Sequence, residues 1–172
     1  MRTLIALLIL FGSIELQAQR FAYVDVKYIL ENVPEYAAAQ EKLNEISNQW
    51  QGEVQGKRQE LEKLFNNFRD EQVLYTDEMR QRKEEEIQAK EDDLNEFRKQ
   101  KFGYKGELFQ KRQELVKPIQ DVIYEHIQKL AKEKRFDFIF DKSAGVQMLY
   151  AKPSLDKSKD ILKSMGYSST NK

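Results

Sequence analysis

Apolar residues in the middle of the chain recur mostly every three or four positions, separated by charged and amide side chains. Lysine occupies some positions of this pattern: Lys57, Lys90, Lys101 and Lys111. One stripe consists of Leu43, Ile46, Trp50, Val54, Leu61, Leu64 and Phe68. A second consists of Ile87, Leu94, Phe97, Tyr104, Leu108 and Leu115. This spacing places apolar side chains along one face of a helix and is typical of a coiled coil. We therefore predict two long helices within residues 35–117.

The two predicted helices reverse direction near residues 73–77. Between Pro34 and Pro118 the chain consists mainly of strong helix formers, and Val73-Leu74-Tyr75-Thr76-Asp77 is the one plausible interruption. Thr76 or Asp77 can cap the second helix, and Glu78 places negative charge in its first turn. The pattern predicts an antiparallel coiled-coil hairpin, an arm about 60 Å long with its tip at 73–77.

Denser apolar patterns flank the arm in residues 19–34 and 118–166. Residues 21–26 favour a strand, and a helix with a wide apolar face follows Pro118. Residues 136–141 and 146–150 read as a β-hairpin whose turn places Gly145 in a left-handed conformation. A last helix, capped by Ser158, is expected to end at Gly166. We predict a mainly α protein with a small α/β body, a polar tail at 167–172 and no internal repeat.

The first residues resemble an export signal. Arg2 precedes an apolar run from Leu4 to Phe11, Gly12 and Ser13 follow, and the segment ends at the small residue Ala18. This arrangement is typical of a secretory signal peptide over residues 1–18, and the run is too short to cross a bilayer stably. We expect cleavage after Ala18 and a soluble, exported protein from Gln19 onward.

The composition of the chain limits both how it can be stabilised and which kinds of molecule it can bind. Charged residues make up 34% of the chain and cysteine is absent, so helix packing and oligomerisation must provide the stability that disulfides provide elsewhere. Without Arg2 and Glu15 of the leader, 28 basic residues balance 28 acidic ones. This balance favours no nucleic acid, and it argues against contact with a membrane or lipopolysaccharide.

The chain offers little for catalysis. His126 is the single histidine, and no glycine-rich phosphate loop is present. The acidic runs at 84–86 and 91–93 lie on a polar helix, where solvated charge is the expected state. We predict no catalytic residue, no cofactor, no metal site and no enzymatic activity.

Two sets of arm residues remain as functional candidates. The aromatic residues exceed what one narrow seam can bury, so some are expected to contact an apolar or unfolded chain. These candidates are Phe65, Phe68, Phe97, Phe102, Tyr104 and Phe109. Glycines weaken helices, and a possible hinge in the arm is predicted at Gly52, Gly56, Gly103 and Gly106.

Several segments resemble those of the Skp/OmpH periplasmic chaperones. They are Tyr23-Val24-Asp25-Val26, Val33-Pro34-Glu35-Tyr36, Ala131-Lys132-Glu133-Lys134 and Phe138-Ile139-Phe140-Asp141-Lys142-Ser143. The resemblance implies a homotrimer whose arms enclose unfolded outer-membrane proteins, with the strands of each subunit completed by trimerisation. On that basis we expect body and subunit contacts at Tyr23, Val24, Val26, Phe138, Phe140, Val146 and Met148.

The resulting functional hypothesis is an ATP-independent holdase that prevents outer-membrane β-barrel proteins from aggregating in the periplasm. Such an activity requires only enclosure and many weak contacts. The alternative is a coiled-coil scaffold or adaptor of the cell envelope that binds one folded partner.

Overall fold

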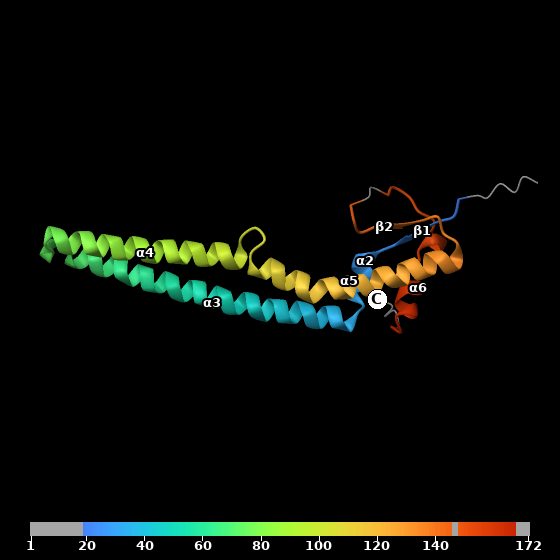
Figure 1. The fold of residues 1–172 in the computed structure, drawn as a ribbon, viewed down its shortest axis with the longest axis horizontal. Coiled ribbons are helices and arrows are strands. Elements are labelled where there is room, and N and C mark those ends of the chain that lie inside the picture. The colour runs from blue at the N-terminus through green and yellow to red at the C-terminus, as the bar shows by residue number, and fades with distance from the viewer. Residues whose placement is uncertain (1–18, 146–147, 168–172) are drawn as a thin grey trace, which may run out of the picture. The chain divides into compact units, whose positions relative to one another are not determined.

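A computed structural model describes residues 19–145 and 148–167 of the chain. The expected signal peptide, Val146 and the tail from residue 168 lie outside these described residues. The chain forms two compact units, each described by itself. We call Leu30–Val122 the arm, and the described residues 19–29 and 123–167 the body. Figure 1 shows the elements of both.

The arm begins with helix α3, Pro34–Glu71, which is 38 residues long. Pro34 occupies the first turn, where a missing N–H costs no helical hydrogen bond, and Val33 before it is extended. A short 3-10 turn, Gln72–Leu74, follows, and helix α4 covers Asp77–Phe102. The Thr76 side chain caps α4 by accepting a hydrogen bond from the Met79 N–H.

Helix α3 runs antiparallel to the returning chain. Near the tip Phe68 packs against Tyr75, farther along Trp50 packs against Phe102, and Lys57 bonds to Asp93. A buried cluster of Ala39, Leu43 and Val116 closes the other end of the arm. The predicted mainly α fold with a long helical hairpin and a small β part is thus confirmed.

The returning chain is not one helix, which differs from the sequence-based expectation of a single interruption at the tip. Helix α4 ends at Phe102, and helix α5, Glu107–Lys134, begins after a loop at residues 103–106. Figure 1 shows this loop, in yellow-green, standing out from the helices beside it. Pro118, by contrast, lies inside α5 without ending it.

The body contains a two-stranded sheet. Strand β1, Phe21–Val24, pairs in parallel with β2, Phe138–Asp141, and Phe21 lies opposite Phe138. Helix α2, Val26–Glu31, follows β1, while a 3-10 turn, Pro153–Leu155, and helix α6, Ser158–Ser164, end the described chain. Buried apolar side chains of the body come from β1, α2, α5 and α6: Ala22, Tyr23, Val24, Val26, Ile29, Ile123, Leu130, Ile161 and Leu162.

Within the described residues 136–145 and 148–150, the predicted β-hairpin of residues 136–150 is not formed. Strand β2 pairs with β1 instead, and the described residues 148–150 are not part of a strand. Leu149 and Tyr150 are among the most exposed apolar side chains, at 90% and 84%. Gly145 does adopt the predicted left-handed conformation, with φ +79°. The turn was therefore recognised correctly, whereas the partner of β2 was not.

The last helix ends as expected but begins differently. Gly166 is left-handed, and the Tyr167 N–H reaches back to the Leu162 carbonyl, which satisfies a terminal acceptor of α6. Ser158 is not the cap of α6; it lies inside the helix and is buried. None of the helices in the described part of the chain has the length and apolar character needed to cross a membrane.

Candidate functional site

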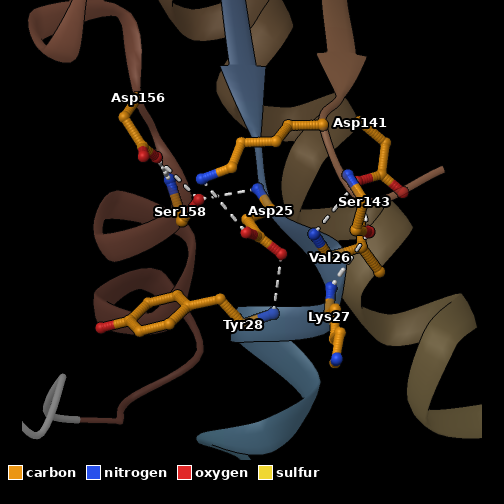
Figure 2. A network of polar contacts seen from close by, with 9 residues as sticks. Asp25, Val26, Lys27, Tyr28, Asp141, Ser143, Asp156 and Ser158 are labelled. Carbon is orange, nitrogen blue, oxygen red and sulfur yellow. Dashed lines mark hydrogen bonds and ion pairs between the residues drawn. The ribbon is translucent and has the colours of Figure 1, made fainter. Parts of the chain in front are cut away.

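Two copies of the triplet Asp-Lys-Ser, at residues 141–143 and 156–158, bind the start of helix α2 (Figure 2). The Asp141 carboxylate accepts hydrogen bonds from the Ser143 N–H and hydroxyl, at 2.8 and 2.7 Å. Asp156 accepts from the Ser158 N–H and hydroxyl in the same way, at 2.9 and 2.7 Å. The same three residues thus form the same local turn at two places in the chain.

Both triplets use their serine hydroxyl to accept a backbone N–H next to the first turn of α2. Ser158 accepts from Asp25 at 2.8 Å, and Ser143 accepts from Lys27 at 3.3 Å. Asp141 also accepts from the Val26 N–H at 3.2 Å. The first N–H groups of a helix have no partner within the helix, so these bonds satisfy donors that would otherwise remain unpaired. We call this network the clasp.

The clasp fixes β1 between two neighbours. The lysine N–H of each triplet donates to a β1 carbonyl: Lys142 to Val24 at 2.8 Å, and Lys157 to Tyr23 at 2.9 Å. Tyr23 also forms a parallel bridge with Asp156, on the edge of β1 opposite β2. Both edges of β1 are thus engaged, and the side chains of Tyr23, Val24 and Val26 are buried within the subunit.

One face of the sheet exposes a group of aromatic rings, which we call the phenylalanine face. It consists of Phe21, Phe138 and Phe140, whose ring centroids are 5.8 to 6.4 Å apart. The three side chains remain 40 to 53% exposed. A contiguous exposed aromatic surface is unusual for a chain that acts alone and indicates a binding surface. Of the other predicted contacts, Met148 is half-buried.

Midway along the arm, aromatic rings and lysines replace an apolar seam. The Lys101 ammonium lies 4.9 Å from the centre of the Trp50 ring and 5.5 Å from that of Phe97, and Lys57 lies 5.3 Å from that of Phe97. Phe102 packs edge-on against Trp50 at 6.2 Å. We call these five residues the mid-arm cluster. Its cation–π contacts hold α3 and α4 together without burying a ring completely.

An ion pair closes the mid-arm cluster on the tip side. The Lys57 ammonium donates to the Asp93 carboxylate at 2.6 Å. This hydrogen bond, reinforced by the opposite charge, raises the pKa of Lys57 and lowers the pKa of Asp93. Lysine thus occupies a position in the apolar stripe because it finds both a carboxylate and an aromatic face there.

The loop at residues 103–106 is a compact turn that needs its glycines. The Gly106 N–H donates to the Gly103 carbonyl at 2.9 Å. A methyl group added at Gly103 would lie 2.3 Å from the Lys99 carbonyl oxygen, and one at Gly106 would lie 2.8 Å from that of Gln100. Lys105 adopts a left-handed conformation, φ 55°, which is uncommon for a residue with a side chain.

The four glycines predicted as a hinge play two different parts. Gly52 and Gly56 lie within the uninterrupted helix α3, and no atom lies within 4 Å of a methyl group added at either. Gly103 and Gly106 instead form the loop that separates α4 from α5. The first pair lowers helix stability without any steric need, whereas the second pair determines the path of the chain.

The aromatic candidates of the arm divide in the same manner. Phe97 lies under two lysines and Phe68 packs against Tyr75, so both are engaged within the arm. Phe102 packs on Trp50 and is 37% exposed. The side chains most exposed to another molecule are Phe65 at 58%, Phe109 at 44% and Tyr104 at 94%. The Tyr104 ring has the Lys105 ammonium of the same loop 5.4 Å from its centre.

Sequence analysis missed an exposed apolar group at the tip. Val73 and Leu74 are 84% and 79% exposed, and Met79 is 47% exposed. The sequence did place these residues at the turn, and an apolar pair within a turn was the available signal. The arm therefore presents apolar side chains at its tip, at Phe65, at the loop and at Phe109.

The chemistry available in the described residues is limited. Within residues 19–145 and 148–167 no three His, Asp or Glu side chains are grouped to hold a metal ion. The His126 Nδ1 lies 2.7 Å from the Ser164 hydroxyl, and that hydroxyl also donates to the Ile161 carbonyl at 2.8 Å. His126 thus joins α5 to α6.

Comparisons with known proteins agree with this architecture. The profile of the family described as outer membrane protein (OmpH-like) matches residues 20–165. A solved structure of a candidate outer membrane chaperone (OmpH-like) from Caulobacter crescentus CB15 is similar, with a TM-score of 0.68 and 14% sequence identity. The alignment covers 90% of this chain and 88% of that one. No curated protein matches.

Proposed function

Since the chain belongs to the OmpH-like outer membrane protein family, we propose that it is an ATP-independent periplasmic holdase for unfolded outer-membrane β-barrel proteins. The observation that carries this proposal is the arm, which exposes apolar side chains at separate places along one hairpin: at the tip, at Phe65, at the loop and at Phe109. Many weak, separated contacts suit a client without fixed structure, because no single contact requires a particular client shape.

The proposal includes a homotrimer in which a second copy of the chain covers the phenylalanine face. Two strands are too few for an independent sheet, and three half-exposed rings on one face are a surface that association would bury. The likeness to the Caulobacter protein supports the fold of such a subunit, and its description supports a chaperone role. The holdase needs no cofactor and no catalytic residue.

The central experiment is native mass spectrometry of the protein from Gln19 onward, alone and after a urea-unfolded outer-membrane barrel protein is diluted into it. We expect a trimer that keeps one client in a soluble complex. A monomer, or a trimer that leaves the client to aggregate, would overturn the proposal. Binding of one folded envelope protein in preference to several unfolded barrels would favour the scaffold alternative.

Two sets of variants separate client binding from assembly. Replacing Phe65, Tyr104 and Phe109 together by serine should weaken client binding about tenfold, equivalent to ~1.4 kcal/mol, while the trimer persists. Replacing Phe138 and Phe140 by serine should instead yield monomers. The matched control replaces three exposed arm glutamines, Gln55, Gln59 and Gln113, by serine and should change neither property.

A further inference from the structure

Both chains of the hairpin are weakened at the same level of the arm. On the returning side, α4 stops at Phe102, and the loop at residues 103–106 separates it from α5. On the opposite side, Gly52 and Gly56 lie in α3 between Trp50, which meets Phe102, and Lys57, which meets Phe97. Each glycine costs a helix interior roughly 1 kcal/mol relative to alanine. The glycine stretch of α3 therefore faces the last turns of α4, directly before the break in the returning chain.

The packing between the chains is also interrupted at this level. In the returning chain the buried residues on the tip side are Ile87 and Leu94, the next one on the base side is Val116, and none of the described residues between Leu94 and Val116 is buried. In α3 the buried residues, Ala39 and Leu43, both precede Trp50. The mid-arm cluster fills this gap with contacts between lysines and aromatic faces. Such contacts depend less on one fixed geometry than interlocking apolar side chains do.

The remaining connections across the loop are few. One ion pair joins Lys101 of α4 to Glu107 of α5 at 2.6 Å, and Gln110 donates to the Lys105 carbonyl at 3.3 Å. A hollow of about 950 Å³ lies beside the loop, between the end of α4 and the start of α5. There is consequently space next to the break into which the loop residues can move.

The geometry points to a joint in the arm at the mid-arm cluster, about which the tip half of the hairpin swings relative to the base half. A hairpin bends only where both of its chains bend, and this is the level at which both are weakened. The joint changes the distance between the exposed apolar groups at the tip and Phe109 near the base. It is a property of the arm alone, so its test needs no client protein.

The test uses distances between pairs of spin labels, measured by double electron–electron resonance. The sequence has no cysteine, so pairs of introduced cysteines label the protein cleanly. One pair, Glu45→Cys with Lys63→Cys, spans the glycines of α3, and a second, Glu91→Cys with Arg112→Cys, spans the loop. A third, Arg82→Cys with Arg98→Cys, lies within α4 and serves as the reference. All six positions are exposed.

The deciding variant carries Gly52→Ala and Gly56→Ala, because no atom lies within 4 Å of a methyl group added at either position. We expect the distance distributions of the first two pairs to be about twofold broader than the reference in the parent protein, and to narrow to the reference width in this variant. The matched control, Gln55→Ala with Gln59→Ala in the same helix, should leave them broad. The joint would be overturned by either of two results. In the parent protein, the first two pairs could give distance distributions as narrow as that of the reference pair. In the Gly52→Ala, Gly56→Ala variant, their distributions could stay as broad as in the parent.

Discussion

The hydroxyl of Ser158 accepts a hydrogen bond of 2.8 Å from the backbone N–H of Asp25, across 133 residues of sequence. Ser158 is 2% exposed, and its hydroxyl donates a hydrogen bond to Asp156. The hydroxyl oxygen therefore acts as a buried acceptor for the N–H that precedes α2. Segments from early and late in the described chain thus meet at one helix terminus. The body depends on polar bonds at this terminus as well as on its apolar core.

Replacing Ser158 by alanine is expected to destabilise the body by about 1–3 kcal/mol, because it leaves the Asp25 N–H without its acceptor in a poorly hydrated place. The matched variant is Ser143→Ala in the other triplet, where the serine is exposed and the bond to Lys27 is longer. We expect that variant to cost less than about 1 kcal/mol. Urea unfolding of both proteins measures the difference, and equal losses would contradict it.

The neighbours Val122 and Ile123 of α5 allow a sharp test of the apolar core. Ile123 is 0% exposed and Val122 is 44% exposed. Ile123→Ala should lower the free energy of unfolding by about 2–5 kcal/mol, because it removes buried methyl groups and leaves a cavity. Val122→Ala in the isolated subunit should change it by no more than about 0.5 kcal/mol. Thermal unfolding followed by circular dichroism decides the matter; a loss shared by both variants would place Val122 in the core.

Replacing the glycines of the arm by alanine should raise the free energy of unfolding at Gly52 and Gly56 and lower it at Gly103. Gly52→Ala and Gly56→Ala each gain about 1 kcal/mol through helix propensity. Gly103→Ala should lose about 1–3 kcal/mol, because the new methyl group lies 2.3 Å from a backbone oxygen that must move. The unfolding midpoint in urea reports both effects. A stabilising Gly103→Ala would show that the turn at residues 103–106 is not the form the chain prefers.

The Lys57–Asp93 pair predicts a dependence of arm stability on pH. The pKa of Asp93 is lowered by the Lys57 ammonium, so its contribution is present above the ordinary Asp pKa and is lost as the pH falls through the lowered value. The pKa of Lys57 is raised by Asp93, so its contribution is present at neutral pH and is lost above the ordinary Lys pKa. Neutral pH lies on the plateau between these losses.

Asp93→Asn should therefore flatten the acid limb of the stability profile, below about pH 4. Asp92→Asn is the control. The Asp92 carboxylate is next to Asp93 in the sequence, but it accepts a hydrogen bond from Gln88 on the same helix and makes no bond to α3 that is described. Thermal unfolding across an acid pH series gives both profiles. An Asp93→Asn profile that parallels the parent down to the lowest pH would show that the pair contributes nothing.

Elements with local signals could be predicted from the sequence. Pro34 and Thr76 act on the turn of helix that contains them, and the stripe of apolar residues sets the face of α3. Gly103 and Gly106 were recognised as a weak spot. Whether the helix continues through such a spot depends on which backbone carbonyls approach it, and this is a tertiary property.

The partner of β2 could not be predicted because it is not local. Residues 136–150 contain a good hairpin pattern, but β1, more than a hundred positions earlier, competes for the same edge. Two aspartates, two serines and the N–H groups of α2 add bonds that only this pairing allows. The repeated triplet is visible in the sequence, but its role depends on the N–H groups at the start of α2, which are more than a hundred residues away.

The long separation between β1 and β2 also affects the order in which the chain folds. The bond from Arg20 to Asp137, at the start of the sheet, closes a separation of 117 residues, which makes it one of the slowest contacts to form by diffusion. Pairing of the arm brings Tyr36 and Ile119 into one cluster and thereby shortens the loop that remains to be closed. The helical hairpin is thus expected to fold first, and β1 and β2 are expected to pair after it, once the loop between them is shortened. Strand β1 is synthesised first among the described elements and finds its partners last.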